Sequence, residues 1–81
     1  METVEIMLDQ TWQRLTDGTV NATLQITGAA GFHLSAARPG DDAPVLRIVN
    51  REMGVTAPSV VWGRALWYED AVRVVIAKEA P

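Results

Sequence analysis

The 81-residue chain contains no cysteine and only one histidine, His33. Without cysteine it forms no disulfide, and a Cys/His zinc site needs several such ligands. Two devices that commonly stabilise small domains are therefore excluded. Apolar residues nevertheless make up 48% of the chain, and three of them are tryptophans. So large an apolar share in so short a chain favours stabilisation by other subunits.

Clusters of basic residues and long apolar runs are also missing. Seven basic residues stand against ten acidic ones, and the net charge is −3. Nucleic acid is a poor partner for such a chain because binding it requires a concentrated positive face. The apolar runs are too short to cross a membrane, and residues 1–10 lack the basic-then-apolar order of a signal peptide. We expect a soluble protein that folds where it is made, with neither nucleic acid nor membrane as partner.

The clearest pattern present is a two-residue alternation in residues 19–27. The apolar positions are Val20, Ala22, Leu24 and Ile26, and the polar ones are Asn21, Thr23, Gln25 and Thr27. Successive side chains of a strand point to opposite faces. This segment is therefore predicted to be a strand with one buried face and one face in water.

Weaker patterns of the same kind run along the rest of the chain. They predict strands in residues 3–8, 11–15, 32–37, 45–49, 60–68 and 72–78. A helical periodicity over residues 1–15 is the competing interpretation there. The whole chain, residues 1–81, is expected to form one all-β domain: a small antiparallel β-sandwich or barrel of about six to seven short strands. Residues 1–10 would add an extra strand or an arm.

Turn residues predict how these segments connect. Asp17-Gly18 is expected to close a hairpin between residues 11–15 and the strand at 19–27. Glu69-Asp70-Ala71 would join the last two strands in a terminal hairpin. Residues 39–44 are a loop by their chemistry, and residues 50–59 are a loop or at most one helical turn. The glycines read as turn residues are Gly28, Gly31, Gly40 and Gly54.

Residues able to support catalysis or metal binding are few. His33 has no cysteine or motif-linked serine beside it, and a general base needs a partner within reach. Asp41-Asp42 lies between turn residues without the spacing of a calcium loop, so it is interpreted as a solvated turn. Asn21-Ala22-Thr23 fits the glycosylation pattern but carries no meaning without a secretion signal. We expect no catalytic residue, no cofactor, no metal and no enzymatic activity.

The tryptophans of residues 60–68 mark the candidate site. In an extended strand Trp62 shares a face with Arg64, Leu66 and Tyr68, whereas Trp67 lies on the opposite face. Both faces are then largely apolar and need a cover. A second layer of the same chain, a neighbouring subunit and a ligand such as a sugar remain open. The candidate oligomer or partner interface is Trp62, Arg64, Leu66, Trp67 and Tyr68.

An order of motifs within residues 12–78 resembles a family. Trp12 precedes Leu15-Thr16-Asp17-Gly18-Thr19 and Ala22-Thr23-Leu24-Gln25-Ile26, followed by Arg38-Pro39-Gly40-Asp41-Asp42-Ala43-Pro44 and Val61-Trp62-Gly63-Arg64-Ala65. This layout resembles small β-rich virion structural proteins of tailed bacteriophages, of the capsid-decoration or head-fibre-base type. The resemblance implies a homo-oligomer, with a trimer favoured, on the capsid surface of a virion. It also implies other virion proteins, such as the major capsid protein, as partners, and synthesis in the host cytoplasm.

Other functions remain as alternatives. A phage tail or neck component has the same kind of small β domain. A carbohydrate- or receptor-binding module would use Trp62 or Trp67 as a platform for a glycan. An enzyme would need a composite site at a subunit interface, because the chain supplies no nucleophile–base pair.

Overall fold

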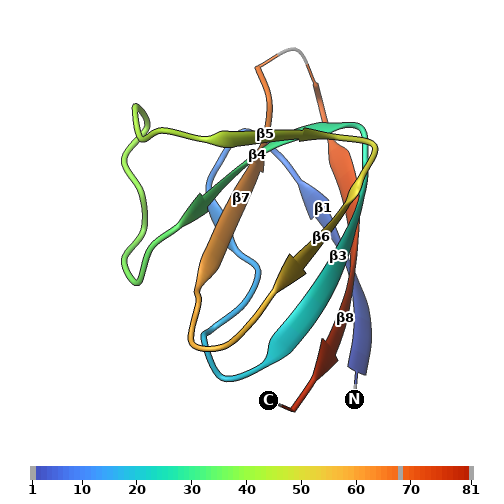
Figure 1. Ribbon diagram of the computed structural model, residues 1–81. Coiled ribbons are helices and arrows are strands. Elements are labelled where there is room, and N and C mark those ends of the chain that lie inside the picture. The colour runs from blue at the N-terminus through green and yellow to red at the C-terminus, as the bar shows by residue number, and fades with distance from the viewer. Residues whose placement is uncertain (1, 68, 81) are drawn as a thin grey trace.

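Two four-stranded antiparallel sheets pack face to face in the computed structural model, which describes residues 2–67 and 69–80 (Figure 1). Sheet 1 has the strand order β1 (Glu2–Leu8), β8 (Val72–Glu79), β3 (Asn21–Thr27) and β6 (Glu52–Val55). Sheet 2 has the order β2 (Gln13–Arg14), β7 (Val61–Ala65), β4 (Ala29–Leu34) and β5 (Leu46–Val49). The predicted all-β class is confirmed, and of its two versions the sandwich is formed rather than a closed barrel. The described residues contain no helix that would suffice to cross a membrane.

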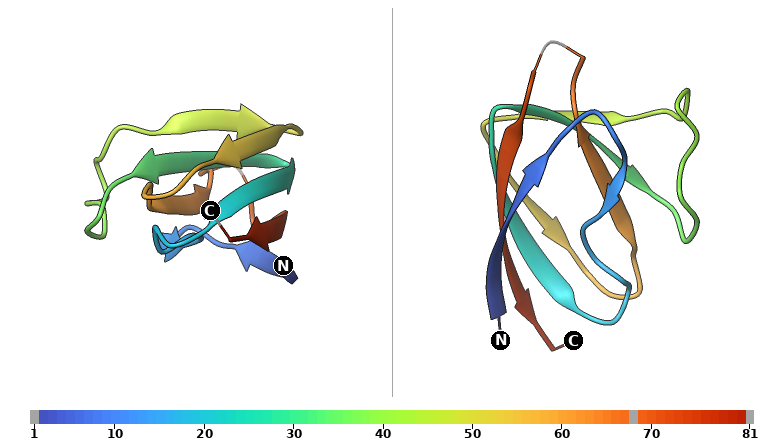
Figure 2. Two further views of the ribbon diagram at one scale, coloured as in Figure 1. Left: turned by 60° about the horizontal axis from the view of Figure 1, so that its bottom comes forward. Right: turned by 180° about the vertical axis from the view of Figure 1, so that it is seen from behind.

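One long hairpin links the two sheets by bending across a corner. β3 and β6 pair in sheet 1, and their continuations β4 and β5 pair in sheet 2. At the corner Gly28 has a φ of 109° and Asn50 a φ of 48°, conformations that favour glycine and asparagine. The Gly28 N–H donates to Asn50 Oδ1 at 2.8 Å, and the Asn50 N–H donates to the Gly28 carbonyl at 3.0 Å. Both strands therefore leave sheet 1 and enter sheet 2 together, as the views in Figures 1 and 2 show.

The core lies between the inner faces of the sheets. β3 alternates buried and exposed side chains along its length, as its sequence predicts. Phe32 of β4 is fully buried, and its ring fits because Gly63 of β7 lies opposite: a Cβ at Gly63 would be 3.0 Å from this ring and from Leu15. The accessible surface of 4828 Å² matches the roughly 4,800 Å² of a folded monomer of this mass. A single copy thus closes its own core.

Both hairpins predicted from local turn residues are wrong. β2 belongs to sheet 2 and β3 to sheet 1, so Asp17-Gly18 carries the chain from one sheet to the other. In the same way β7 pairs with β2 and β4, whereas β8 pairs with β1 and β3, so residues 69–71 close no terminal hairpin. The turn residues mark where the chain changes direction. They do not determine whether the next strand pairs with the preceding one or joins the other sheet.

Several boundaries also differ from the sequence interpretation. Gly31 lies inside β4 and Gly54 inside β6, so neither is a turn residue. β6 occupies part of residues 50–59, which were expected to be a loop. Residues 1–15 contain β1 and β2 instead of the competing helix. The expected strand at 60–68 ends at Ala65.

Candidate functional site

β7 places the predicted interface residues on two different parts of the surface. Trp62 and Arg64 point to the outer face of sheet 2 and are half-buried, while their neighbours on β7 are buried inside. Leu66 and Trp67 follow the end of the strand, and Trp67 is 83% exposed. The expectation that Trp67 shares the face opposite Trp62 is therefore wrong, because the strand ends two residues before it. Tyr68 lies outside the described residues.

The chain's own loop, residues 35–45, covers the outer face of β7. Trp12 Nε1 donates a hydrogen bond to the Gly40 carbonyl at 3.0 Å, and Arg64 Nη2 donates to the Asp41 carbonyl at 2.9 Å. The Arg64 guanidinium lies 4.5 Å from the centroid of the Trp12 ring, a cation–π contact. Trp12 is only 2% exposed as a result. These contacts fasten the middle of the loop to the sheet.

Two further side chains hold the ends of the same loop. Trp62 Nε1 donates to the Ser35 carbonyl at 2.9 Å. His33 Nδ1 lies 2.7 Å from the Pro44 carbonyl, and its ring centroid is 6.1 Å from that of Trp12. Of the three covers left open by the sequence, a layer of the same chain thus lies over Trp62 and Arg64. His33 is engaged in this anchoring of the loop.

Exposed apolar side chains gather beside the loop. Among residues 2–67 and 69–80, six large hydrophobic residues are exposed, and four of them lie on β5, next to its start or at the end of β4. They are Leu34, Val45, Leu46 and Val49, and we call them the β5 edge. Within the part of the chain that the structure describes, β5 pairs only with β4, so its other side has no neighbouring strand. Sequence reasoning missed this surface because a short apolar run does not reveal whether its strand is central or at an edge.

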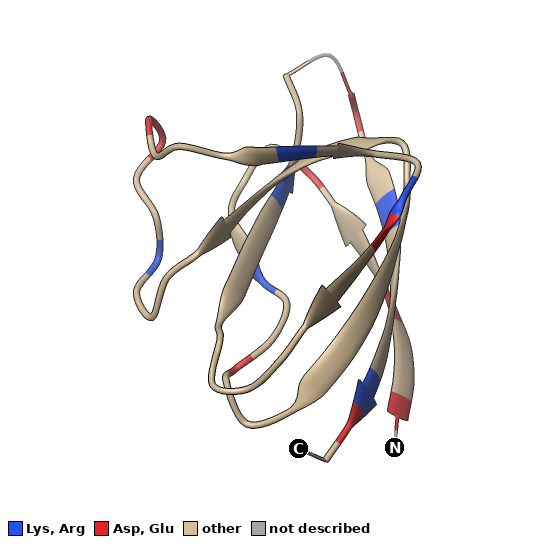
Figure 3. Cartoon of the chain, viewed as in Figure 1, with Lys and Arg blue, Asp and Glu red and all other residues tan. Residues whose placement is uncertain are grey.

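The fold also collects positive charge on sheet 2. Its strands carry Arg14, Arg47 and Arg64 and no acidic residue. Gly31 pairs with both Arg64 and Arg47, so these two arginines lie in one row across the sheet. The strands of sheet 1 carry four acidic residues and two basic ones. Figure 3 shows this separation, which the spacing of the arginines in the sequence does not reveal.

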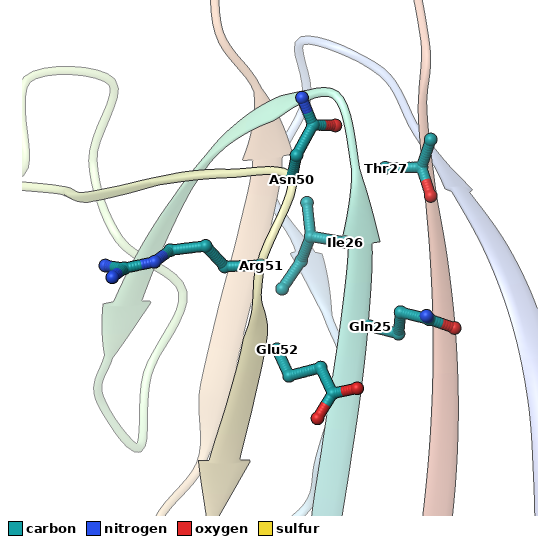
Figure 4. A pocket seen from close by; sticks show the side chains of 6 residues that line it. All are labelled: Gln25, Ile26, Thr27, Asn50, Arg51 and Glu52. Atoms are coloured by element: carbon teal, nitrogen blue, oxygen red, sulfur yellow. The ribbon is translucent and has the colours of Figure 1, made fainter.

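An open hollow of about 290 Å³ lies at the bend of the long hairpin. Its lining residues are Gln25, Ile26, Thr27, Asn50, Arg51 and Glu52 (Figure 4). Asn50 is already bonded to Gly28 at the corner, and the Arg51 side chain points away from Gln25 and Thr27. This hollow brings together no nucleophile and base, so we do not take it as the functional site.

The acidic side chains outside the strands are spread over several connecting segments. Within residues 2–67 and 69–80 no three His, Asp or Glu side chains converge as metal ligands would. Asp41 and Asp42 lie in the exposed turn of the loop over sheet 2. Asp17 is exposed, and hydrogen bonds from the Thr19 hydroxyl and N–H lower the pKa of its carboxyl. Asp17 thus stabilises the turn in which the chain passes from sheet 2 to sheet 1.

No protein-family model matches the chain, and neither a curated protein nor a solved structure matches it significantly.

Proposed function

We propose that this protein is a structural component of a bacteriophage virion, which binds copies of itself and other virion proteins and catalyses no reaction. A capsid-surface decoration protein or the base of a head fibre or spike is the preferred role, with a homotrimer as the preferred assembly. A tail or neck component is the alternative within the same class. The β5 edge is the observation that carries the proposal.

The apolar side chains of the β5 edge have no role in closing the core. The core is complete in one copy, yet Leu46 is 55% exposed and Leu34 is 50% exposed at the same edge. Apolar side chains gathered at an open sheet edge mark a surface that another protein covers. Burying them against a second surface contributes roughly 25 cal/mol per Å² of apolar area. Such a surface suits assembly rather than turnover of a small molecule.

Three of the motifs that carry the resemblance meet at one place. Trp12, Arg64 and the loop of residues 39–44 are far apart in the sequence, and in the structure they hold one another. Their contacts fix the loop that leads directly into β5. The shared layout would therefore define the shape of the surface beside the β5 edge, which supports a role in assembly.

Light scattering across a dilution series tests the proposal. We expect the unaltered protein to form an oligomer of defined mass that dissociates on dilution. The double variant Leu46→Gln/Val49→Thr should raise the dissociation constant at least about tenfold, the equivalent of 1.4 kcal/mol. Ala71→Ser, at an exposed position in the turn before β8, is the control and should leave the mass unchanged. A monomer that also fails to bind purified capsids would contradict the proposal.

The exposed ring of Trp67 favours a second candidate function, binding of a glycan or host receptor. Its 83% exposure leaves a large aromatic surface in solvent, whereas Trp12 is covered and Trp62 is half-buried. Aromatic rings commonly stack on sugars and other ligands. Fluorescence titration with a panel of oligosaccharides should show a change that Trp67→Ala abolishes. An unchanged spectrum across the panel would remove this candidate.

A further inference from the structure

The crossing from β2 to β3 runs through the dipeptide Asp17-Gly18, and the fold fixes both residues. Gly18 has a φ of 88°, and a Cβ at this position would lie 2.9 Å from the Pro58 carbonyl oxygen, so the position needs glycine. Asp17 Oδ1 accepts hydrogen bonds from the Thr19 N–H at 3.0 Å and from the Thr19 hydroxyl at 2.6 Å. An aspartate that bonds the main chain two residues further on stabilises a turn. The crossing is therefore built on an aspartate followed directly by a glycine.

An aspartate in this position can react with its own main chain. The Gly18 nitrogen attacks Cγ of Asp17, and the new N–Cγ bond closes a five-membered succinimide ring; the amide hydrogen and the carboxyl hydroxyl leave as water. Glycine favours this step because it has no side chain to shield its nitrogen. Water then opens the ring. Cleavage of the N–Cγ bond restores aspartate, whereas cleavage between this nitrogen and the main-chain carbonyl carbon of Asp17 gives isoaspartate.

We propose that Asp17-Gly18 is a modification site, at which aspartate converts spontaneously to isoaspartate, and that the Thr19 hydroxyl restrains this reaction in the folded protein. Asp17 is exposed, so water reaches the succinimide. The two hydrogen bonds to Oδ1 hold the carboxyl toward residue 19. Ring closure requires the carboxyl to turn toward the Gly18 nitrogen and to lose one oxygen, so these bonds oppose it.

The charge of the carboxyl acts in the same direction as its position. Ring closure proceeds from the neutral carboxyl, because a carboxylate has no hydroxyl to lose as water. The hydrogen bonds from the Thr19 hydroxyl and N–H lower the pKa of Asp17. The neutral form is therefore rarer in the folded chain than in the unfolded chain, which slows the reaction further.

Isoaspartate changes the length of the crossing. Its Cβ becomes part of the main chain, which gains one carbon between two anchored points. On one side Thr16 Oγ1 donates to the Ser59 carbonyl at 3.2 Å and accepts from the Val61 N–H at 3.1 Å. On the other side Asn21 Oδ1 accepts from the Ala57 N–H at 2.9 Å. Since these anchors fit a main chain of normal length, the isomerised protein should melt at a lower temperature.

Incubation of the folded protein tests the site, with isoaspartate at residue 17 measured by peptide mapping and electron-transfer dissociation. Thr19→Val keeps the main-chain donor and loses the hydroxyl, so it should accumulate isoaspartate at least about threefold faster, the effect of one lost hydrogen bond. Thr19→Ser keeps a hydroxyl and should restore the slow rate. The full chain unfolded in guanidinium chloride lacks the turn and should react fastest. Circular dichroism checks that both variants are folded.

Each part of the inference has an outcome that would overturn it. Equal rates in the folded and unfolded chains would show that the fold gives no protection. A rate for Thr19→Val no faster than that for Thr19→Ser would rule out the role of the hydroxyl. Absence of isoaspartate at residue 17 in both the folded and the unfolded chain would contradict the site itself. An isomerised fraction, isolated by chromatography, that melts like the unaltered protein would contradict the effect on the crossing.

Discussion

The two sheets of this sandwich have the same number of strands and different outer faces. Sheet 1 leaves the polar side chains of β3 in water, as in the alternation of Thr23, Gln25 and Thr27. Sheet 2 places aromatic and basic side chains outward and covers part of them with the loop of residues 35–45. The difference shows that the alternation of apolar and polar residues is enough to predict a sheet whose outer face meets water. The cover of sheet 2 cannot be predicted in this way, because it comes from a loop elsewhere in the chain.

The inner faces differ as well. Sheet 1 fills its side of the core with many aliphatic side chains: Leu8, Ala22, Leu24, Ile26, Val55, Val72, Val74 and Ile76. Sheet 2 contributes one large ring, Phe32, among the smaller residues Ala30, Val61 and Ala65. Phe32 is therefore the largest side chain in this half of the core, where Leu15 and the partly buried Ile48 also pack.

Truncation of that ring should have the largest effect. Phe32→Ala removes a fully buried side chain beside Gly63 and leaves a cavity that small neighbours cannot fill. We expect a loss of about 3–5 kcal/mol in the free energy of unfolding, measured by urea denaturation. Ile76→Val in sheet 1 is the comparison and should cost only about 0.5–1.5 kcal/mol. A loss below about 2 kcal/mol for Phe32→Ala would contradict the central place of this ring in the core.

Two glycine substitutions compare the packing around one strand of each sheet. A Cβ at Gly63 would lie 3.0 Å from Phe32 and Leu15, whereas a Cβ at Gly54 meets nothing within 4 Å. Gly63→Ala should therefore destabilise the fold by about 1–3 kcal/mol through overpacking. Gly54→Ala should be stabilising by roughly 0.4–1 kcal/mol because it restricts the unfolded chain. Thermal melting of both variants checks the opposite signs, and shifts of the same sign would refute the contrast.

Release of the loop over sheet 2 should have a smaller and local effect. Trp62→Phe removes the indole N–H that donates to the Ser35 carbonyl, at a cost of about 0.5–1.5 kcal/mol. Hydrogen exchange should become faster at the Ala43 amide, which is bonded within the loop, and stay slow in β3. Thr23→Val on the exposed face of sheet 1 is the control. Faster exchange in both sheets would mean that the loop is not a separate unit.

The smallest effect is expected at the crossing between the sheets. The pKa of Asp17 is lowered by the hydrogen bonds from Thr19, so its charged form is favoured in the folded state. Its contribution is complete above the unfolded pKa of about 3.9 and is lost as pH falls through the lowered value. Asp17→Asn lacks this dependence. The difference in melting temperature between the two proteins should therefore shrink as pH falls below about 4, and a constant difference would contradict the assignment.

The sequence predicts the fold well where one face of a strand meets water. Residues 19–27 show the pattern plainly, and the structure places β3 at Asn21–Thr27 with the expected face buried. The loop at 39–44 is also confirmed, because Pro39 and Gly40 cannot continue a strand easily. Both features are encoded within a few neighbouring residues.

Pairing and the candidate site depend on distant residues, and there the sequence is a poor guide. Nothing near Asp17 indicates that β2 and β3 join different sheets, because the hydrophobic faces of both sheets accept a strand. The sequence suggests that Gly31 is a turn residue. In the structure a Cβ at this position would lie 3.2 Å from Val45, so the glycine allows close packing within the sheet. The prediction that Trp62 and Arg64 share one face is correct. Their cover comes from a distant loop, because Arg64 binds Asp41, which lies 23 residues away in the sequence.

The position of β8 affects how the chain can acquire its structure during synthesis. β8 lies in the middle of sheet 1, between β1 and β3, and Glu2 pairs with Lys78. While the ribosome still holds Val72–Glu79, neither β1 nor the adjacent side of β3 has its partner. Pairings over such sequence distances are slow to form. The nascent chain therefore cannot complete sheet 1 until β8 has left the ribosome.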